Sequence, residues 1–123
     1  MLLAELFSGK RLRPLGYTVL AVFVCAIAYR RVSHSERVRT TRAAIVDVEQ
    51  AVYAFRAELD RCPRSLIELM HPPSERAQYL SAMPRDAWGK ELLLRCPGEL
   101  KPHSADVVSA GPSGSFSVDD NIY

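Results

Sequence analysis

The chain has 123 residues, of which 48% are hydrophobic and 24% charged, and its formal net charge is +2. This composition is typical of one folded domain and excludes a disordered chain. The charge is too small to indicate a nucleic-acid partner. The basic excess lies at the start of the sequence, in Lys10, Arg11 and Arg13, so that a chain beginning at Tyr17 would have no net side-chain charge.

An uncharged apolar run over residues 15–29 follows these basic residues. A helix that crosses a bilayer needs about 20 mainly apolar residues, so this run is short for a membrane span. A secretory signal would place its cleavage site at Ala26-Ile27-Ala28 and leave Tyr29 first. A lipoprotein signal would need a small residue before Cys25, where the chain has Val24.

A third interpretation places the cleavage site before the apolar run, at Gly16, and keeps the run as an anchor. Beyond the run, apolar residues recur at Val38, Ile45, Val48, Val52, Phe55 and Leu59. Their spacings along the sequence are seven, three, four, three and four residues. These steps make one stripe of an amphipathic helix. Neither proline nor glycine follows Gly16 before residue 61, so run and stripe can form one helix. A core helix after a cleaved signal is the alternative, and Tyr53, which lies off the stripe, is a candidate subunit contact.

Short elements are predicted after the long helix. Cys62-Pro63 ends that helix, and Ser65 with Glu68 forms a capping box that opens a second, short helix. Strands are predicted over residues 91–96 and 106–109, followed by a glycine- and serine-rich loop to the terminus. This order indicates an α+β fold in which a small antiparallel sheet covers the stripe of the long helix.

Three motifs resemble a known family. "MPRDAWG", residues 83–89, resembles the Leu-Pro-Lys-Asp-Pro-Trp-Gly run of the major pseudopilins of type II secretion, the protein G family. "PLGYTVL", residues 14–20, is similar to the prepilin-peptidase signal, and "VVSAGPSGSFSVDDNIY", residues 107–123, is similar to the family's closing loop. The resemblance runs from about Arg13 to the terminus.

The resemblance implies a pilin-like α+β subunit and not an enzyme, and the sequence has no catalytic motif. Residues 1–16 would be a prepilin leader, 17–31 an apolar membrane and filament-core helix, 32–61 its amphipathic continuation, and 62–123 a periplasmic head. Prepilin peptidase would cut between Gly16 and Tyr17 and leave Tyr17 with a methylated amine. The subunit would sit in the bacterial inner membrane with one span, and then join copies of itself and minor pseudopilins in a pseudopilus that drives protein export across the outer membrane.

One departure from the family concerns assembly. Members have glutamate at the fifth mature position, where this chain has Ala21. A charge inside an apolar bundle must be paired or neutralised, and that glutamate is thought to pair with a neighbour's N-terminal amine. The chain therefore either does not need this pair or is a specialised subunit. Two other classes stay open: a minor or initiating pilin of another filament system, and a monomeric secreted or membrane-tethered binding domain.

The closing loop is a candidate calcium site, because it binds calcium in the G-type family. The resemblance implies Asp119 and Asp120 as carboxylate ligands, with backbone carbonyls near Ala110, Ser113 and Ile122. Calcium takes six to eight oxygen ligands, and Ser113 replaces an aspartate of the family loop. We therefore expect weak or vestigial binding, and a solvated acidic terminus is the alternative.

Cysteine is the remaining source of chemistry. Cys25 lies in the apolar run and is expected to act as a small apolar residue. In an oxidising envelope compartment, Cys62 and Cys96 can join the end of the helix to the sheet by a disulfide. The alternative is a zinc site that adds His71 and His103, although the spacing fits no short zinc motif.

Overall fold

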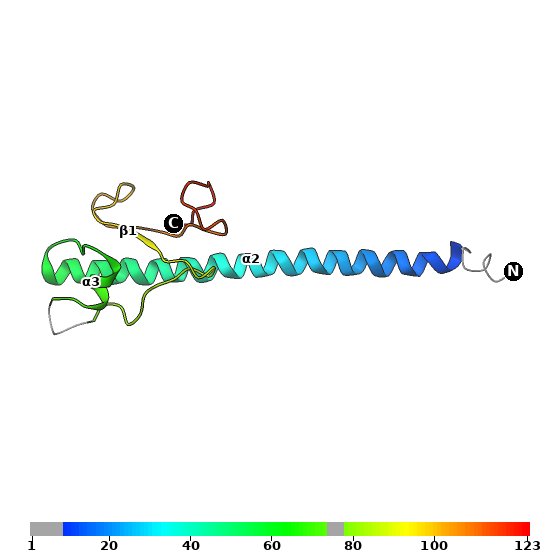
Figure 1. Cartoon of the computed structure of the whole chain (residues 1–123), viewed down its shortest axis with the longest axis horizontal. Helices are drawn as coiled ribbons and strands as arrows, with labels where there is room; N and C mark the ends of the chain where they lie inside the picture. The colour runs from blue at the N-terminus through cyan, green and yellow to red at the C-terminus, as the bar shows by residue number, and fades with distance from the viewer. Residues whose placement is uncertain (1–8, 74–77) are drawn as a thin grey trace. The chain divides into compact units, whose positions relative to one another are not determined.

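The structure is a computed structural model, and it describes residues 9–73 and 78–123. Four elements follow one another in these residues: α2 (Gly9–Leu59), α3 (Leu66–Met70), β1 (Leu93–Arg95) and β2 (Asp106–Val108) (Figure 1). The chain divides into two units between Ser35 and Glu36. The predicted α+β class, with one long helix, one short helix and a small antiparallel sheet, is confirmed.

The first part of α2 is apolar and exposed. Side chains from Leu15 to Val32 are open to solvent, with Val22 70% and Phe23 63% exposed. By length and composition, the described helix from Pro14 onward is able to cross a membrane. The first half of the predicted leader, residues 1–8, lies outside the described residues, whereas residues 9–16 already belong to α2.

The second part of α2 forms one wall of the hydrophobic core. Its buried side chains are those of the predicted stripe, Ile45, Val48, Val52 and Phe55, with Ala51 beside them. They pack against residues of the head: Leu66, Leu69, Leu92, Ala105, Val107 and Ile122. The Phe55 ring also meets the edge of Tyr79, with 5.4 Å between ring centroids. Burial of this stripe is therefore what fixes the head on α2.

α2 ends at Leu59, two residues before the predicted end at Arg61. Asp60 has a positive φ of 52° and donates its N–H to the Arg56 carbonyl at 2.9 Å. Aspartate tolerates this left-handed backbone better than most residues. The helix therefore stops at a local turn before it reaches Pro63.

β1 and β2 pair antiparallel, with Leu93 opposite Val108 and Arg95 opposite Asp106. Both strands are shorter than predicted. Two isolated bridges extend the pairing, Arg85 with Glu91 and Ser109 with Ile122. The second bridge returns the end of the chain to the sheet.

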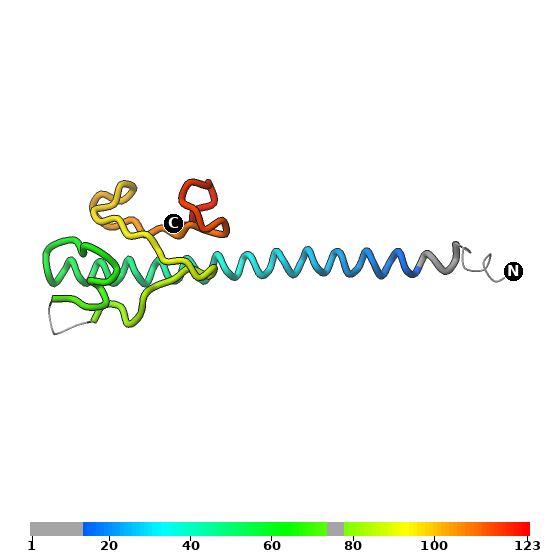
Figure 2. The backbone as a smooth tube through the Cα atoms, viewed as in Figure 1, coloured from blue at the N-terminus to red at the C-terminus, as the bar shows by residue number. Residues whose placement is uncertain are grey.

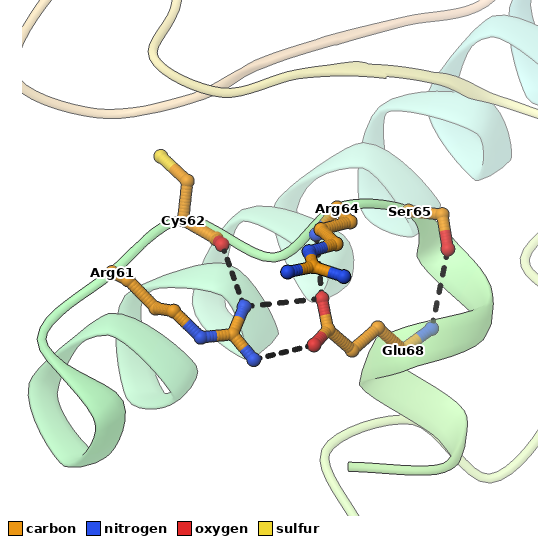
Figure 3. Close-up of polar contacts among 5 residues, drawn as sticks. All are labelled: Arg61, Cys62, Arg64, Ser65 and Glu68. Carbon is orange, nitrogen blue, oxygen red and sulfur yellow. Dashed lines mark hydrogen bonds and ion pairs between the residues drawn. The ribbon is translucent and has the colours of Figure 1, made fainter. Parts of the chain in front are cut away.

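α3 begins at a cap that differs in one respect from the predicted capping box. The Ser65 hydroxyl accepts from the Glu68 N–H at 3.4 Å, as expected. The Glu68 carboxylate, however, accepts from the backbone N–H of Arg64 at 2.6 Å and from the Arg61 guanidinium at 2.5 Å (Figure 3). The hydrogen bond from Arg61, followed by that from Arg64, lowers the pKa of Glu68 to about 2. The cap therefore ties α3 to the segment that leaves α2.

Candidate functional site

The C-terminal loop closes around the hydroxyl of Ser113. Asp120 accepts from the Ser113 N–H at 2.9 Å and from its Oγ at 2.8 Å. The same Oγ lies 3.3 Å from the carbonyl oxygens of Ala110 and Ser115, and it accepts from the Ser115 N–H at 3.2 Å. We call these four residues the Ser113 network; the loop that carries it is the red end of the tube in Figure 2.

The glycine at position 111 lets the loop fold this tightly. It has a positive φ of 66°, and a Cβ there would lie 2.1 Å from the Asp120 carbonyl oxygen. Any other residue would therefore collide with the backbone that carries Asp120. Gly111 brings the two ends of the loop together so that Ser113 reaches Asp120.

The residues of the loop do not fit a calcium ion well. Of the five predicted ligands, the structure brings Ala110, Ser113 and Asp120 together, but both Asp120 oxygens already accept from Ser113. Asp119 is exposed and takes no part in the described hydrogen bonds of the loop, and the Ile122 carbonyl accepts from the Ser109 N–H at 2.9 Å. No group of three His, Cys, Asp or Glu residues that could hold a metal occurs among the described residues. One carboxylate with a hydroxyl and carbonyls is a poor donor set for calcium, which favours several charged oxygens.

A second polar cluster, which the sequence reasoning missed, holds the "MPRDAWG" segment. One oxygen of the Asp86 carboxylate accepts from the backbone N–H of Trp88 at 3.0 Å and of Lys90 at 2.9 Å. The other accepts from the Ser109 hydroxyl at 2.7 Å. Asp86 and Ser109 are both buried, so each needs these partners. We call Asp86, Trp88, Lys90 and Ser109 the Asp86 cluster.

The Asp86 cluster connects α2, the sheet and the C-terminal loop. Thr41, fully buried on α2, accepts from the Ala87 N–H at 3.0 Å. On the other side, the Ser109 hydroxyl accepts from the Gly111 N–H at 3.0 Å. The sequence offered one signal for this role, since an aspartate two residues before Trp88 and three before Gly89 is typical of a side chain that caps its own turn.

Cys62 and Cys96 are joined by a disulfide, with 5.7 Å between their Cα atoms and 34 residues of sequence separation. The bond links the segment after α2 to the residue after β1. Because both sulfur atoms bond to each other, neither is a thiolate that could bind zinc with His71 and His103. Cys25 is free and exposed in the first part of α2.

The predicted processing residues lie within α2. Gly16 has no atom within 4 Å of the position where a Cβ would stand, and Tyr17 is exposed. Ala21, the position of the missing glutamate, is also exposed on the helix.

Comparison with known proteins decides the family. The family model described as type II secretion system protein G matches residues 29–122, which is most of the chain. This chain belongs to that family. Its relative in Escherichia coli strain K12, type II secretion system core protein G, is 27% identical over 85% of this chain and 79% of the relative.

The fold agrees with a solved member. The crystal structure of the major pseudopilin from the type 2 secretion system of enterohaemorrhagic Escherichia coli matches with a TM-score of 0.62, covering 73% of this chain and 83% of that one at 24% identity. At that identity the likeness shows the pilin-like fold alone. Together with the family match, the chain is a pseudopilin subunit of a type II secretion system, in a family whose members are structural subunits.

Proposed function

We propose that the chain is a membrane-anchored subunit that assembles with copies of itself, and with minor pseudopilins, into a periplasmic pseudopilus that drives export across the outer membrane. The observation that carries the proposal is the first part of α2. Its large apolar side chains are exposed, which would cost free energy in water. They need lipid or the same segment of other subunits as surroundings.

The same segment supports a single-pass anchor in the bacterial inner membrane with the head in the periplasm. The helix from Pro14 onward is long and apolar enough, by length and composition, to cross a membrane. After the apolar run, α2 carries a cluster of exposed arginines suited to lipid headgroups or solvent: Arg30, Arg31, Arg37, Arg39 and Arg42. A disulfide in the head also suits the oxidising periplasm.

Maturation is proposed at Gly16, with prepilin peptidase releasing Tyr17 as the methylated N-terminus. Cleavage there would remove the basic leader and leave residues 17–31 as the membrane and filament segment. Ala21 supports a subunit whose assembly does not use a glutamate at that position. It is also the observation that favours the alternative, a minor or initiating pilin of another filament system.

The intact mass of the mature protein, isolated from its native envelope, tests the proposal. We expect a chain that starts at Tyr17 and is heavier by one CH2 group, because a methyl group replaces an amine hydrogen. It should also be lighter by two hydrogens than the reduced form, because Cys62 and Cys96 are bonded. A start at Tyr29 would mean an ordinary secretory signal and contradict the proposal. A start at Met1 would indicate an uncleaved tether and favour the monomeric binding domain.

A further inference from the structure

Five exposed arginines follow the apolar run of α2 within a short stretch of sequence: Arg30, Arg31, Arg37, Arg39 and Arg42. We call these five residues the arginine belt. Within residues 9–73 and 78–123, none of the five side chains forms an ion pair, because the ion pairs there use other basic residues. The positive charge of the belt is therefore not neutralised by the described part of the chain.

The charge of the chain beyond Gly16 divides at the end of the belt. Residues 17–42 hold five arginines and one acidic residue, Glu36, so their side chains carry a formal charge of +4. Residues 43–123 hold eight basic and twelve acidic residues, and their side chains carry −4. An asymmetry of this kind within one chain is typical of a protein that meets an anionic surface with one part only.

The apolar run before the belt is too short for the hydrocarbon layer of a bilayer. As a helix, residues 17–29 cover about 20 Å, whereas that layer is about 30 Å thick. Tyr17 and Tyr29 bound the run and are 72% and 75% exposed, and tyrosine is enriched at membrane interfaces. A bilayer accommodates a short span by local thinning and by flanking side chains that reach for the interface. The first arginines after Tyr29 therefore lie at the depth of the lipid headgroups.

The chemistry of Arg30 and Arg31 suits phosphate at that depth. These two residues directly follow Tyr29, so they carry the first charges after the run. An unpaired charge beside hydrocarbon costs free energy, and an arginine there needs an anionic partner. The planar fork of N–H donors in a guanidinium group matches two oxygens of one phosphate, which the ammonium group of lysine does not. Every basic residue between positions 17 and 42 is an arginine.

We propose that the arginine belt binds the phosphate groups of anionic phospholipids at the membrane surface, and thereby sets the depth of the anchor. Arg30 and Arg31 make the direct phosphate contacts. Arg37, Arg39 and Arg42 follow later in the sequence and add attraction over a longer range. The inference rests on the proposed function, because it takes residues 17–31 as the segment that lies in lipid.

A second copy of the chain is the competing partner, because residues 43–123 are acidic overall. Six of their carboxylates are already engaged within the chain, in ion pairs or as buried hydrogen-bond acceptors: Glu49, Glu68, Glu91, Glu99, Asp86 and Asp106. A lipid surface, in contrast, presents phosphate groups at the depth where the belt begins. The belt therefore matches a lipid surface better than a second copy.

The lipid selectivity of the mature full chain tests the proposal. The chain is isolated from its native envelope in a non-ionic detergent, and native mass spectrometry counts the phospholipids that stay bound to it. Phosphatidylglycerol and phosphatidylcholine with the same acyl chains are offered in equal amounts. We expect at least about tenfold more phosphatidylglycerol to be retained, because only its headgroup carries a net negative charge. A large excess of inorganic phosphate should not displace it, because free phosphate has no acyl chain to lie beside the apolar run.

Double variants that remove two arginines each locate the contact. R30Q/R31Q should weaken retention of phosphatidylglycerol by about twenty-fivefold, because one arginine near an anionic surface contributes about fivefold. R39Q/R42Q removes the same charge nine to eleven residues further along the sequence, and should weaken retention by less than about fivefold. R85Q/R95Q removes two exposed arginines of the head and is the matched control, which should retain the lipid like the unchanged chain.

The outcomes separate the lipid contact from the proposed function. Equal retention of the two lipids, or equal losses in all three double variants, would overturn the contact. Displacement by inorganic phosphate would also overturn it and would identify a site for free phosphate. The anchor is measured separately, by retention of the chain in carbonate-washed membranes. If the unchanged chain is lost from those membranes, or if the mature protein starts at Tyr29, the proposed function fails and the lipid contact fails with it.

A second measurement detects the contact in a bilayer. The full chain, with ¹³C-labelled arginine, is reconstituted in vesicles of phosphatidylcholine and phosphatidylglycerol, and solid-state NMR measures the dipolar coupling between arginine Cζ and lipid ³¹P. We expect coupling that R30Q/R31Q abolishes and R85Q/R95Q leaves unchanged. Equal coupling in R30Q/R31Q and the unchanged chain would overturn the proposal. If R30Q/R31Q instead lowers only the fraction of the chain in oligomers, the belt binds a second copy and the assignment to lipid is wrong.

Discussion

The two parts of α2 differ in what covers their apolar side chains. In the second part, Val48 and Phe55 are fully buried by the head of the same chain. In the first part, side chains such as Val22 and Phe23 are exposed. One part is thus satisfied by intramolecular packing, and the other requires lipid or other subunits. A single helix can therefore be a folded-domain element at one end and an assembly element at the other.

Replacing Phe55 by alanine, in the second part of α2, should produce the largest loss of stability. Phe55 is fully buried, and truncating such a ring typically costs about 3–5 kcal/mol of unfolding free energy. Denaturant unfolding of the full chain in detergent, followed by Trp88 fluorescence, measures the loss. Membrane retention should not change. Tyr53→Ala, two residues away but exposed, is the control and should cost under about 0.5 kcal/mol; equal losses would contradict the distinction between the two faces.

Val22→Arg tests the first part of α2, whose apolar side chains are exposed. An arginine at the centre of a membrane helix costs about 2.5–3.5 kcal/mol for insertion. We expect less of the chain in carbonate-washed membranes, with unfolding of the head unchanged. Val46→Arg, a change of the same kind at an exposed position in the second part of α2, should leave retention intact. If Val22→Arg is retained like the unchanged chain, residues 17–31 are not the anchor.

The sequence predicted those features that depend on periodicity. The stripe from Val38 to Leu59 identified the buried face of α2, because burial on a helix follows a 3.6-residue repeat. The end of α2 was predicted too late, because the turn at Asp60 depends on one residue's tolerance of a positive φ. The strands were predicted too long, because their length is set by the pairing partner and not by their own residues.

The polar clusters were harder to predict. Asp86 meets Ser109, 23 residues later, and a contact of that kind leaves no periodic signal. Ser113 was recognised as the residue that replaces an aspartate, but its role at the centre of four hydrogen-bonding groups depends on the turn at Gly111. The family resemblance located the loop. The geometry of the loop determined which of its residues form hydrogen bonds with one another.

The C-terminal loop belongs to the head, but polar contacts rather than apolar burial hold it together. We expect the melting temperature of the unchanged chain to be the same in calcium and in a chelator. Ser113→Asp should lower stability in the chelator by about 1–3 kcal/mol, because it replaces a hydroxyl donor by a second carboxylate facing Asp120. Added calcium should then restore it.

The control for that loop is Ser117→Asp, which adds the same charge at a residue whose hydroxyl bonds to Ser115 and not to Asp120. It should show no response to calcium. A rise in the melting temperature of the unchanged chain on adding calcium would contradict the conclusion that its donor set does not suit the ion.

The smallest expected effect concerns the ion pair beside the end of α2. The hydrogen bond from Arg61 lowers the pKa of Glu68 from 4.5 to about 2. A carboxyl whose pKa is lower in the folded state stabilises the fold above its ordinary pKa and loses that contribution as the pH falls toward 2. Glu68→Gln should therefore be less stable than the unchanged chain at pH 6, and the difference should shrink between about pH 4.5 and 2. Unfolding at a series of pH values measures it. Glu99→Gln, at the exposed pair with Arg95, should show almost no difference at either pH. A constant difference for Glu68→Gln across the range would mean that Glu68 acts through packing and not through its charge.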